Sequence, residues 1–483
     1  MKKEGNGKRD GGDTGAMERD MAGRHIRETE QTADPDSMAD LNGKKVLVIG
    51  LGKSGTAAAE ALKSVGAQVC VYDGKEDEKK RQWAEENGFF ASFGERPASV
   101  EGFDLAVLSP GVPADLDFIL QISENGTEVI GELELAYRLG RGKYIAITGT
   151  NGKTTTTALT GEIFRASKRR TEVVGNIGVA VVSKALTASE DTFLVTECSS
   201  FQLETIKEFH PFVSALLNVT PDHLNRHKTM ENYIRAKARI FENQTQSDYF
   251  VYNSDDEICS KEASSCRATA VPFSRRNLLD FGAFVRDGKI VIADGGSETE
   301  ICGVEELLIP GSHNLENALA AAAIAWFSGI GAETIAAVLR SFPGVSHRLE
   351  RCGEKNGVSF VNDSKGTNPD AAIRAVRSFH NIVLIAGGYD KGAEFGEFVG
   401  SFDGHVRELV LLGTTAPKIR KAAEDAGFHR IHMVKNMKEA VNLSWSLAEP
   451  GDTILLSPAC ASWDMYEKFE DRGDDFKRCV AEL

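Results

Sequence analysis

Residues 144–155 read Tyr-Ile-Ala-Ile-Thr-Gly-Thr-Asn-Gly-Lys-Thr-Thr, an apolar strand followed by a glycine-rich loop and the start of a helix. This is the form of a phosphate-binding loop, in which backbone N–H groups cradle phosphate oxygens. Lys153 would neutralise the β- and γ-phosphates, and the Thr154 hydroxyl would reach Mg²⁺. Ile147 stands where the strict motif has its first glycine, which argues against a motor protein or a GTPase. The stretch predicts a nucleotide-binding α/β domain.

A carboxylate is expected close to this loop. Glu197 ends the apolar strand predicted at 193–197. Metal ions offset the negative charge that phosphoryl transfer concentrates, so a carboxylate at a strand end beside a phosphate loop is the expected partner of Mg²⁺. The strand pattern alone does not distinguish this role from that of a surface glutamate.

A second glycine turn lies near the start of the chain. Residues 50–55 read Gly-Leu-Gly-Lys-Ser-Gly, follow an apolar strand and open a helix. Glycine permits a tight turn and the close approach of a diphosphate to the N–H groups at the helix N-terminus. Asp73 ends the next strand, where a carboxylate that reads ribose or base would lie. The pattern fits NAD, a uridine diphosphate group or a turn without ligand, and it does not choose among them.

The chain repeats one unit, which consists of a short apolar strand, a loop of small residues and a helix. Several strands are nearly continuous Val, Ile and Leu, which is typical of parallel strands covered on both faces. Strands are predicted at 45–49, 68–72, 105–108, 144–148, 193–197, 213–219, 249–252, 358–361, 382–386, 409–412 and 453–456. An alanine-rich helix is predicted at 313–328, ending near Gly329. The sequence therefore predicts α/β architecture with mostly parallel sheets.

Length and composition limit the possible classes of protein. A chain of 483 residues is too long for one hydrophobic core, and about three domains are expected. The net charge of −15 argues against a nucleic-acid-binding protein. No apolar run could cross a bilayer and no signal peptide opens the chain, so we expect a cytoplasmic protein. The eight cysteines lack metal-ligand spacing and are expected to be free thiols.

Changes of pattern along the chain give the expected domain limits. Residues 1–37 are rich in charged residues and glycine and almost lack large apolar side chains, which predicts a disordered extension. We predict a Rossmann-like domain at 38–140, a central P-loop-type domain with a mostly parallel sheet at 141–345, and a C-terminal Rossmann-like domain at 346–483. Glycines near residue 140 and the pair Pro343-Gly344 mark the two junctions.

Seven motifs in a fixed order carry a resemblance to a known family. They are 149–155 (Gly-Thr-Asn-Gly-Lys-Thr-Thr), 197–204 (Glu-Cys-Ser-Ser-Phe-Gln-Leu-Glu), 218–224 (Asn-Val-Thr-Pro-Asp-His-Leu), 313–317 (His-Asn-Leu-Glu-Asn), 347–348 (His-Arg), 362–369 (Asn-Asp-Ser-Lys-Gly-Thr-Asn-Pro) and 457–464 (Ser-Pro-Ala-Cys-Ala-Ser-Trp-Asp). Together they resemble the Mur ligases, and among these the members that add D-glutamate to UDP-N-acetylmuramoyl-L-alanine in peptidoglycan synthesis. The resemblance extends from about residue 41 to the C-terminus.

The resemblance implies a substrate for each domain. The first domain would bind the UDP end of the sugar-peptide, the middle domain ATP and Mg²⁺, and the last domain D-glutamate and part of ATP. The glycine turn would then hold uridine diphosphate instead of a nicotinamide. The positions that match UDP-substrate residues are Gly50, Gly52, Lys53, Ser54, Gly55, Asp73 and Asn176. The positions that match D-glutamate contacts are Thr367, Lys391, Ser462 and Phe469.

The resemblance also implies the ATP-binding, metal-binding and catalytic residues. The ATP positions are Gly149, Thr150, Asn151, Gly152, Lys153, Thr154, Thr155, Asn317, Arg348 and Asp363. The metal positions are Thr154, Glu197, His223 and Lys237, the last of them as a carbamate. The catalytic positions are Lys153, His223, Lys237, Arg348 and Lys365. The sequence around Lys237, taken without the resemblance, predicts an ordinary exposed lysine on a helix.

The implied reaction is ATP-dependent amide formation. Transfer of the γ-phosphoryl group turns a carboxylate, which has no good leaving group, into an acyl phosphate. The amine of D-glutamate then attacks, and a tetrahedral intermediate expels phosphate, while Lys153, Arg348 and Mg²⁺ neutralise the approaching anions. We expect a monomer that neither binds nucleic acid nor inserts into a membrane. Other amide ligases of the same superfamily, an NAD-dependent oxidoreductase and a non-catalytic nucleotide sensor are the alternatives.

Overall fold

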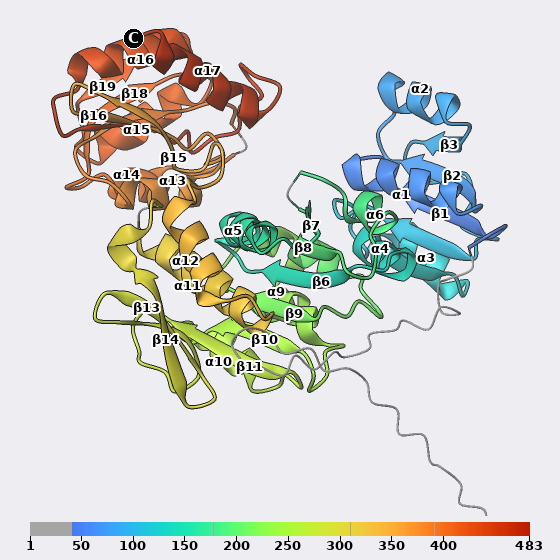
Figure 1. The fold of residues 1–483 in the computed structure, drawn as a ribbon. Coiled ribbons are helices and arrows are strands. Elements are labelled where there is room, and N and C mark those ends of the chain that lie inside the picture. Colours follow the sequence, from blue (N-terminus) through green and yellow to red (C-terminus); the bar gives the residue numbers. More distant parts are fainter. Residues whose placement is uncertain (1–40, 177, 310, 391) are drawn as a thin grey trace, which may run out of the picture.

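A computed structural model describes residues 41–176, 178–309, 311–390 and 392–483. These residues form three sheets flanked by helices, which follow one another along the chain from blue to red in Figure 1. The predicted α/β fold class with three domains is confirmed. The predicted disordered extension at 1–37 lies outside the described residues. The predicted domain limits fall between the sheets and stay predictions.

The first sheet is fully parallel, with the strand order β3-β2-β1-β4-β5. Its strands are β1 (Lys45–Ile49), β2 (Gln68–Asp73), β3 (Phe90–Phe93), β4 (Leu105–Leu108) and β5 (Glu128–Gly131). Its helices are α1 (Lys53–Ser64), α2 (Glu78–Glu86), α3 (Asp117–Glu124) and α4 (Glu132–Leu139). The strand order reverses at β1, so the loops after β1 and β4 diverge and leave a crevice at the carboxyl ends of these strands.

The second sheet has nine strands in the order β14-β13-β12-β11-β10-β9-β6-β8-β7. Its parallel part contains β6 (Lys143–Thr148), β7 (Thr171–Gly175), β8 (Phe193–Glu197), β9 (Val213–Leu216), β10 (Tyr249–Asn253), β11 (Thr269–Ser274) and β12 (Gly282–Arg286). Two antiparallel strands, β13 (Lys289–Asp294) and β14 (Ser297–Gly303), extend it. The sequence analysis did not predict β7, β11, β12, β13 and β14, although β13 contains a continuous apolar run at 290–293.

Small helices and one long helix surround this sheet. They are α5 (Lys153–Ala166), α6 (Val181–Ala185), α7 (Ser200–Leu203), α8 (Leu224–His227), α9 (Met230–Ala238), α10 (Glu257–Ala263), α11 (Ser312–Phe327) and α12 (Ala332–Ser341), with short 3₁₀ turns at Arg239–Phe241 and Val304–Glu306. The predicted alanine-rich helix is confirmed as α11, and Gly329 just beyond it has a φ of 80°. All residues 318–326 of α11 are buried, and the small alanines let it pack closely on α5 and the sheet.

The third sheet has the order β15-β16-β20-β17-β18-β19. Its strands are β15 (Glu350–Lys355), which is antiparallel to β16, and the parallel strands β16 (Val358–Asn362), β17 (Ile382–Ala386), β18 (Val406–Leu411), β19 (Ile431–Met433) and β20 (Thr453–Leu456). Its helices are α13 (Pro369–Arg377), α14 (Gly396–Gly400), α15 (Ala416–Asp425), α16 (Met437–Leu447) and α17 (Phe469–Ala481). Because β16, β20 and β17 are neighbours, the loops at their carboxyl ends meet at one edge.

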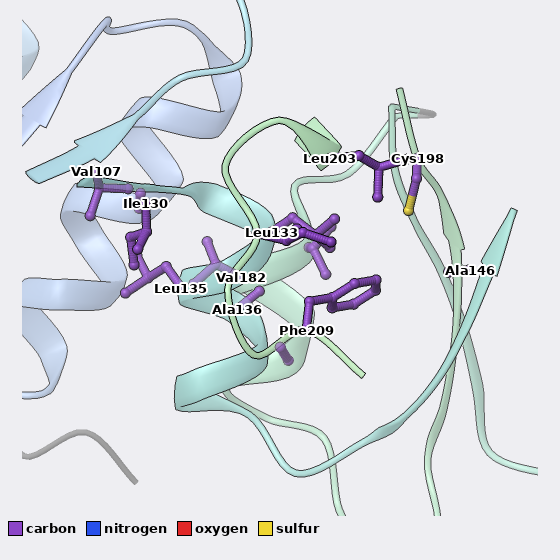
Figure 2. Close-up of a cluster of buried hydrophobic side chains, with 14 of the residues drawn as sticks. Val107, Ile130, Leu133, Leu135, Ala136, Ala146, Val182, Cys198, Leu203 and Phe209 are labelled. Carbon is purple, nitrogen blue, oxygen red and sulfur yellow. The ribbon is translucent and has the colours of Figure 1, made fainter. Parts of the chain in front are cut away.

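The first two domains share one hydrophobic core, centred on α4. Figure 2 shows its side chains, of which Val107, Ile130, Leu133, Leu135, Ala136, Ala146, Val182, Cys198, Leu203 and Phe209 are labelled. Glu134 of α4 is fully buried, and its carboxylate accepts hydrogen bonds from the backbone N–H groups of residues 207–209. Separating these two domains would expose the core and remove the three backbone N–H partners of that carboxylate.

Two expectations from composition can be compared with these residues. The eight cysteines are all unpaired thiols, and five of them are buried, namely Cys198, Cys259, Cys302, Cys460 and Cys479. Among the described residues, no helix has the length and apolar character that crossing a membrane requires.

Candidate active site

The phosphate loop between β6 and α5 is held by side chains from other elements. Asn218, just after β9, brackets Asn151, because its Oδ1 accepts from the Asn151 N–H (2.8 Å) and its Nδ2 donates to the Asn151 carbonyl (3.1 Å). Gly152 has a φ of 82°, and a Cβ at this position would collide with the Asn317 side chain of α11. Only glycine fits there without strain. The fold thus places Asn317, an expected ATP contact, directly beside the loop.

Two lysine side chains end on the carbonyl groups of this loop. Lys153 Nζ donates to the Gly149 carbonyl (2.8 Å) and to the Thr150 carbonyl (2.9 Å). Lys237 Nζ, from α9, also donates to the Gly149 carbonyl (2.8 Å) and lies 4.6 Å from the centre of the Tyr233 ring. Lys237 is only 1% exposed, so the simple expectation of an exposed helical lysine is wrong. Helical periodicity did not reveal that α9 packs this face against the loop.

Burial changes the chemistry of both amines. It lowers the pKa of Lys153, although the nearby Glu197 carboxylate acts in the opposite direction. It lowers the pKa of Lys237 much further, and the positive charge of Lys153 adds to this effect. A larger fraction of Lys237 is therefore the neutral amine, which is the form that can add carbon dioxide.

Glu197 has an unused carboxylate oxygen at the end of β8. The side chain is 2% exposed, and its Oε1 accepts a hydrogen bond from Asn176 Nδ2 (2.9 Å). Its Oε2 is buried and has no hydrogen-bond partner among the described residues. Such an oxygen suits a bound cation, because a buried charge without a partner is costly. The structure thus places Asn176 beside Glu197, the expected metal position.

His223 occupies a strained turn before α8. Its φ is 53° and its ψ is 27°, a left-handed conformation that few non-glycine residues adopt and that occurs preferentially at functional sites. The imidazole lies 5.0 Å from the Phe201 ring centre, and its Nε2 lies 3.5 Å from Asp222 Oδ2. The described residues contain no group of three or more His, Cys, Asp or Glu side chains placed to hold a metal. A role for His223 at Mg²⁺ stays a prediction.

A cavity of about 830 Å³ lies between the second and third domains. The predicted site residues that line it are Thr150, Asn151, Gly152, Thr155, Asn317, Arg348, Asp363, Lys365, Thr367 and Phe469. Gly149, Lys153 and Thr154 do not line its wall. Lys365 Nζ lies 3.4 Å from Thr154 Oγ1 and thereby links the third domain to the phosphate loop. The fold brings the predicted ATP residues of two domains to one space.

Two of the predicted site residues that line this cavity have shifted pKa values. Burial lowers the pKa of Lys365 to about 8, and the adjacent Arg348 contributes to the shift. Burial raises the pKa of Asp363 to about 7, against the hydrogen bond that Ser457 Oγ donates to its Oδ2 (2.8 Å). Perturbed groups facing a cleft are typical of functional sites.

The Arg348 side chain has a hydrogen-bond donor that is not used within the described residues. Its Nε is buried and has no hydrogen-bond partner among the described residues. Its neighbours His347 and Leu349 have φ values of 63° and 45°, so the backbone on both sides is in a sparsely populated conformation. Leu349 N–H donates to Asp363 Oδ1 (3.3 Å), which fixes this segment to the Asp363 loop. This geometry suits an arginine side chain that binds an anion.

Arg374 and His313 are among the cavity-wall residues that the sequence analysis did not assign to the site. Arg374 of α13 lines the cavity, and within the described ranges its guanidinium makes no hydrogen bond or ion pair. His313 also lines it, and burial lowers its pKa to about 4, so it is neutral at physiological pH. His313 stands in a motif that the sequence analysis quoted, whereas nothing in the sequence distinguishes Arg374 from Arg377 on the same helix.

The first domain has its own pocket, of about 590 Å³, at the crevice between the loops after β1 and β4. Of the predicted UDP-substrate residues, Gly50 and Asp73 line it, whereas Gly52, Lys53, Ser54 and Gly55 do not. Asp73 Oδ2 accepts a hydrogen bond from the Leu51 N–H (2.7 Å), so this carboxylate shapes the turn. Wall residues that the sequence analysis did not identify are Gly94, Arg96, Gly111, Val112, Pro113 and Gln121. They lie in loops and helices without a motif.

The predicted amino-acid contacts are distributed around the third domain. Thr367 and Phe469 line the large cavity. Ser462 is buried in the loop after β20 and does not line it. Lys391 lies outside the described residues. Of the three positions that the structure describes, two lie at the cavity wall.

Comparisons with known proteins agree with this division. Residues 44–131 match the family model of the Mur ligase MurD-like N-terminal domain, residues 147–325 the Mur ligase middle domain, and residues 347–460 the Mur ligase glutamate ligase domain. The chain is 50% identical over 451 residues to the UDP-N-acetylmuramoylalanine--D-glutamate ligase of Thermoanaerobacter sp. (strain X514), covering 92% of this chain and 99% of the relative. It is also 50% identical to the ligase of the same name from Clostridioides difficile (strain 630) over 450 residues, covering 92% and 100%.

Solved structures have the same fold. The UDP-N-acetylmuramate-alanine ligase MurC of Thermotoga maritima aligns with a TM-score of 0.56 at 19% identity and covers 91% of this chain and all of its own. MurF of Acinetobacter baumannii aligns with a TM-score of 0.56 at 16% identity, covering 92% of each chain. At these identities the likeness concerns the three-domain fold alone.

Proposed function

The chain belongs to the Mur ligase family, and from this premise we propose that it is the ligase that joins D-glutamate to UDP-N-acetylmuramoyl-L-alanine with ATP. Relatives named for this activity cover nearly the whole chain at 50% identity. The reaction forms an amide bond and releases ADP and phosphate in the synthesis of peptidoglycan precursors.

One observation carries the assignment of the active site, namely the cationic groups from two domains that surround one phosphate loop. Lys153 comes from the second domain, and Lys365 and Arg348 from the third, with Lys365 in contact with Thr154. An ATP γ-phosphate and a carboxylate repel each other, so their reaction requires positive charge fixed in advance around both. Cations from two domains around one loop suit a reaction between two anions.

Each chemical step then has residues suited to it. A substrate carboxylate oxygen attacks the γ-phosphorus, ADP leaves, and Lys153, Lys365 and Arg348 balance the charge that develops. The amine of D-glutamate next attacks the acyl carbon, the tetrahedral intermediate expels phosphate, and the amine loses its proton. The lowered pKa of Lys365, about 8, is suited to exchanging protons near neutral pH. The remaining acceleration comes from holding the reactants together.

We propose Mg²⁺ as the metal that accompanies ATP. Glu197 Oε2, which is buried without a partner among the described residues, fits a cation, and Thr154, His223 and carbamylated Lys237 would complete the site. When bound, Mg²⁺ would neutralise phosphate oxygens. If Lys237 is carbamylated, labelled bicarbonate should give a carbamate signal in nuclear magnetic resonance spectra of the protein. A Lys237→Arg variant should lack that signal, and its persistence there would exclude Lys237.

We assign the UDP group to the first-domain pocket beside Asp73, within the predicted domain 38–140. ATP and Mg²⁺ belong to the domain 141–345, and D-glutamate to the domain 346–483. We place the enzyme in the cytoplasm as a monomer, and light scattering of the purified chain would test the oligomeric state.

The direct test is release of phosphate from ATP by the purified chain. We expect release that depends on UDP-N-acetylmuramoyl-L-alanine and on D-glutamate together. L-glutamate, L-alanine and diamino acids should give little release in parallel reactions. ATP hydrolysis that ignores the amino acid would contradict the proposal, as would faster turnover with another amino acid.

A further inference from the structure

Arg472, in the first turns of α17, is an unusual buried cation. It is 1% exposed and is the largest of the fully buried side chains in the described part of the chain. Its guanidinium forms no ion pair with any carboxylate there. Burial lowers its pKa to about 10, which still leaves it charged at neutral pH. Burying a charge without a counter-ion is costly, so its hydrogen bonds must replace those of water.

All of its hydrogen bonds go to two loops. Nε donates to Ser364 Oγ (2.9 Å), and Nη2 donates to the Ser364 carbonyl (2.8 Å). Both Nη atoms donate to the Cys460 carbonyl (3.1 Å each), and Nη1 also donates to the Ala461 carbonyl (3.2 Å). One planar group therefore joins the loop after β16 to the loop after β20.

A third loop is attached to the same point. Residues 387–390 follow β17, and the Tyr389 N–H donates to the Ala461 carbonyl (2.9 Å). A Cβ on Gly388 would collide with that carbonyl and would lie 3.1 Å from Arg472 Nη1. The start of α17 is also connected, since Ser364 Oγ donates to the Phe469 carbonyl (2.8 Å).

These segments carry or directly precede the positions expected to contact the amino acid. Thr367 follows Ser364, Ser462 follows Ala461, and Phe469 opens α17. The three loops meet because β16, β20 and β17 are adjacent parallel strands. Adjacency of the strands alone does not fix how the three loops are placed relative to one another. The hydrogen bonds of Arg472 fix the loops after β16 and β20, and the hydrogen bond from Tyr389 to Ala461 adds the loop after β17.

We propose that Arg472 is the positioning residue of the amino-acid site, holding three strand-end loops and the start of α17 in the arrangement that receives D-glutamate. This inference rests on the proposed function, because it takes D-glutamate as the ligand of these loops. Arg472 itself does not line the cavity and is not a catalytic residue. Lysine cannot replace it, because a single ammonium group lacks the fork of donors that reaches both loops.

The test is steady-state kinetics of Arg472→Lys with each substrate varied in turn. We expect the KM for D-glutamate to rise about tenfold or more, because small misplacements of binding groups are costly. The KM values for ATP and UDP-N-acetylmuramoyl-L-alanine should stay within about twofold.

Arg407→Lys is the matched control. Arg407 is bound to the buried Asp452 (2.7 Å) in the same domain, but at the amino-terminal edge of the sheet, away from the three loops. This variant should leave all three KM values unchanged. A Ser364→Ala variant removes only the hydroxyl between Arg472 and Phe469, and it should raise the KM for D-glutamate by a smaller factor.

The proposal is overturned if Arg472→Lys leaves the KM for D-glutamate unchanged or raises all three KM values together. If Arg472→Lys does not fold, Ser364→Ala decides, and an unchanged KM for D-glutamate in that variant overturns the proposal. Failure of the proposed function itself is recognised separately, because the wild-type chain would then show no phosphate release that depends on D-glutamate.

Discussion

Two strand–glycine loop–helix units, one in the first domain and one in the second, differ in how they treat charge. In the first, residues 50–55, the Leu51 N–H is already bound to Asp73, and Lys53 is exposed. In the second, residues 149–155, the amine of Lys153 is bound to loop carbonyls and Lys237 is buried beneath it. The lysine of the first loop is exposed to solvent, whereas the amines of Lys153 and Lys237 at the second loop are shielded from it.

This difference separates binding from chemistry. An exposed lysine is screened by solvent and adds little to the electrostatic potential. Partly buried amines act in a lower dielectric, where their effect on a phosphate or a developing charge is much larger. Under the proposed function, the same local fold would bind a diphosphate in one domain and promote phosphoryl transfer in the other. Four predictions would break or sharpen this contrast.

The largest effect is expected at the lysines that open the two helices. Lys153→Ala should lower kcat/KM by about 10³-fold, because a preorganised cation at the transferring phosphate is lost. Lys53→Ala, the equivalent change in the first loop, should raise the KM for the UDP-sugar substrate by no more than about fivefold and leave kcat intact. Initial rates of phosphate release measure both. Comparable losses in the two variants would refute the contrast.

A moderate effect is expected at Asp73. Asp73→Asn weakens the acceptor that holds the Leu51 N–H and removes the charge paired with Lys80 (2.8 Å). The KM for the UDP-sugar substrate should rise about tenfold without a change in kcat, since uniform binding is lost. Asp104→Asn is the control, because Asp104 accepts from the Lys45 N–H in the same domain but at an exposed position outside the pocket. A fall in kcat with Asp73→Asn would mean that the first loop takes part in the chemistry.

A smaller effect is expected at Arg374, which adds a further cation to the cavity between the second and third domains. Arg374→Gln should raise the KM for ATP about threefold to fivefold, because a cation facing the cavity is lost. Arg377→Gln, an exposed change on the same helix, should have no effect. ATP titrations at fixed concentrations of the other substrates would check this. Equal KM values for the two variants would exclude Arg374 from the ATP site.

The smallest effect is expected at Glu132, in the hydrophobic core that the first and second domains share. Burial raises the pKa of Glu132 to about 7, and its Oε1 accepts from the Val182 N–H (2.7 Å). A raised pKa means that its contribution to stability is complete below about pH 4.5 and is lost as the pH rises through about 7. The difference in Tm between Glu132→Gln and the wild type should therefore shift in favour of the variant by roughly 2 °C when the pH is raised from about 5 to about 8. Calorimetry at both values would measure the gain, and a constant Tm difference would contradict it.

Much of the fold and part of the site could be predicted from the sequence. Continuous apolar runs predicted β1, β4 and β8 with the observed bounds, because parallel strands are buried on both faces. The edge strand β14 gave no such signal, because its first four residues are polar. Ordered motifs predicted Arg348, Asp363 and Lys365, which the structure brings to one cavity. Gly52 and Lys53 matched a motif as well, yet they do not line the first pocket, because a motif fixes the turn and not its wall.

The sequence by itself determined local conformation and chemical identity, which are the strand and helix pattern, the two glycine loops and the family. Only the tertiary structure decided which side chains lose contact with water. Lys237 and Arg472 appear in sequence as ordinary cations on helices, and packing makes them buried groups with carbonyl partners. The physical reason is that backbone conformation and side-chain identity depend on a residue and its near neighbours in the chain. Desolvation depends instead on every segment that packs around a group, however distant in sequence.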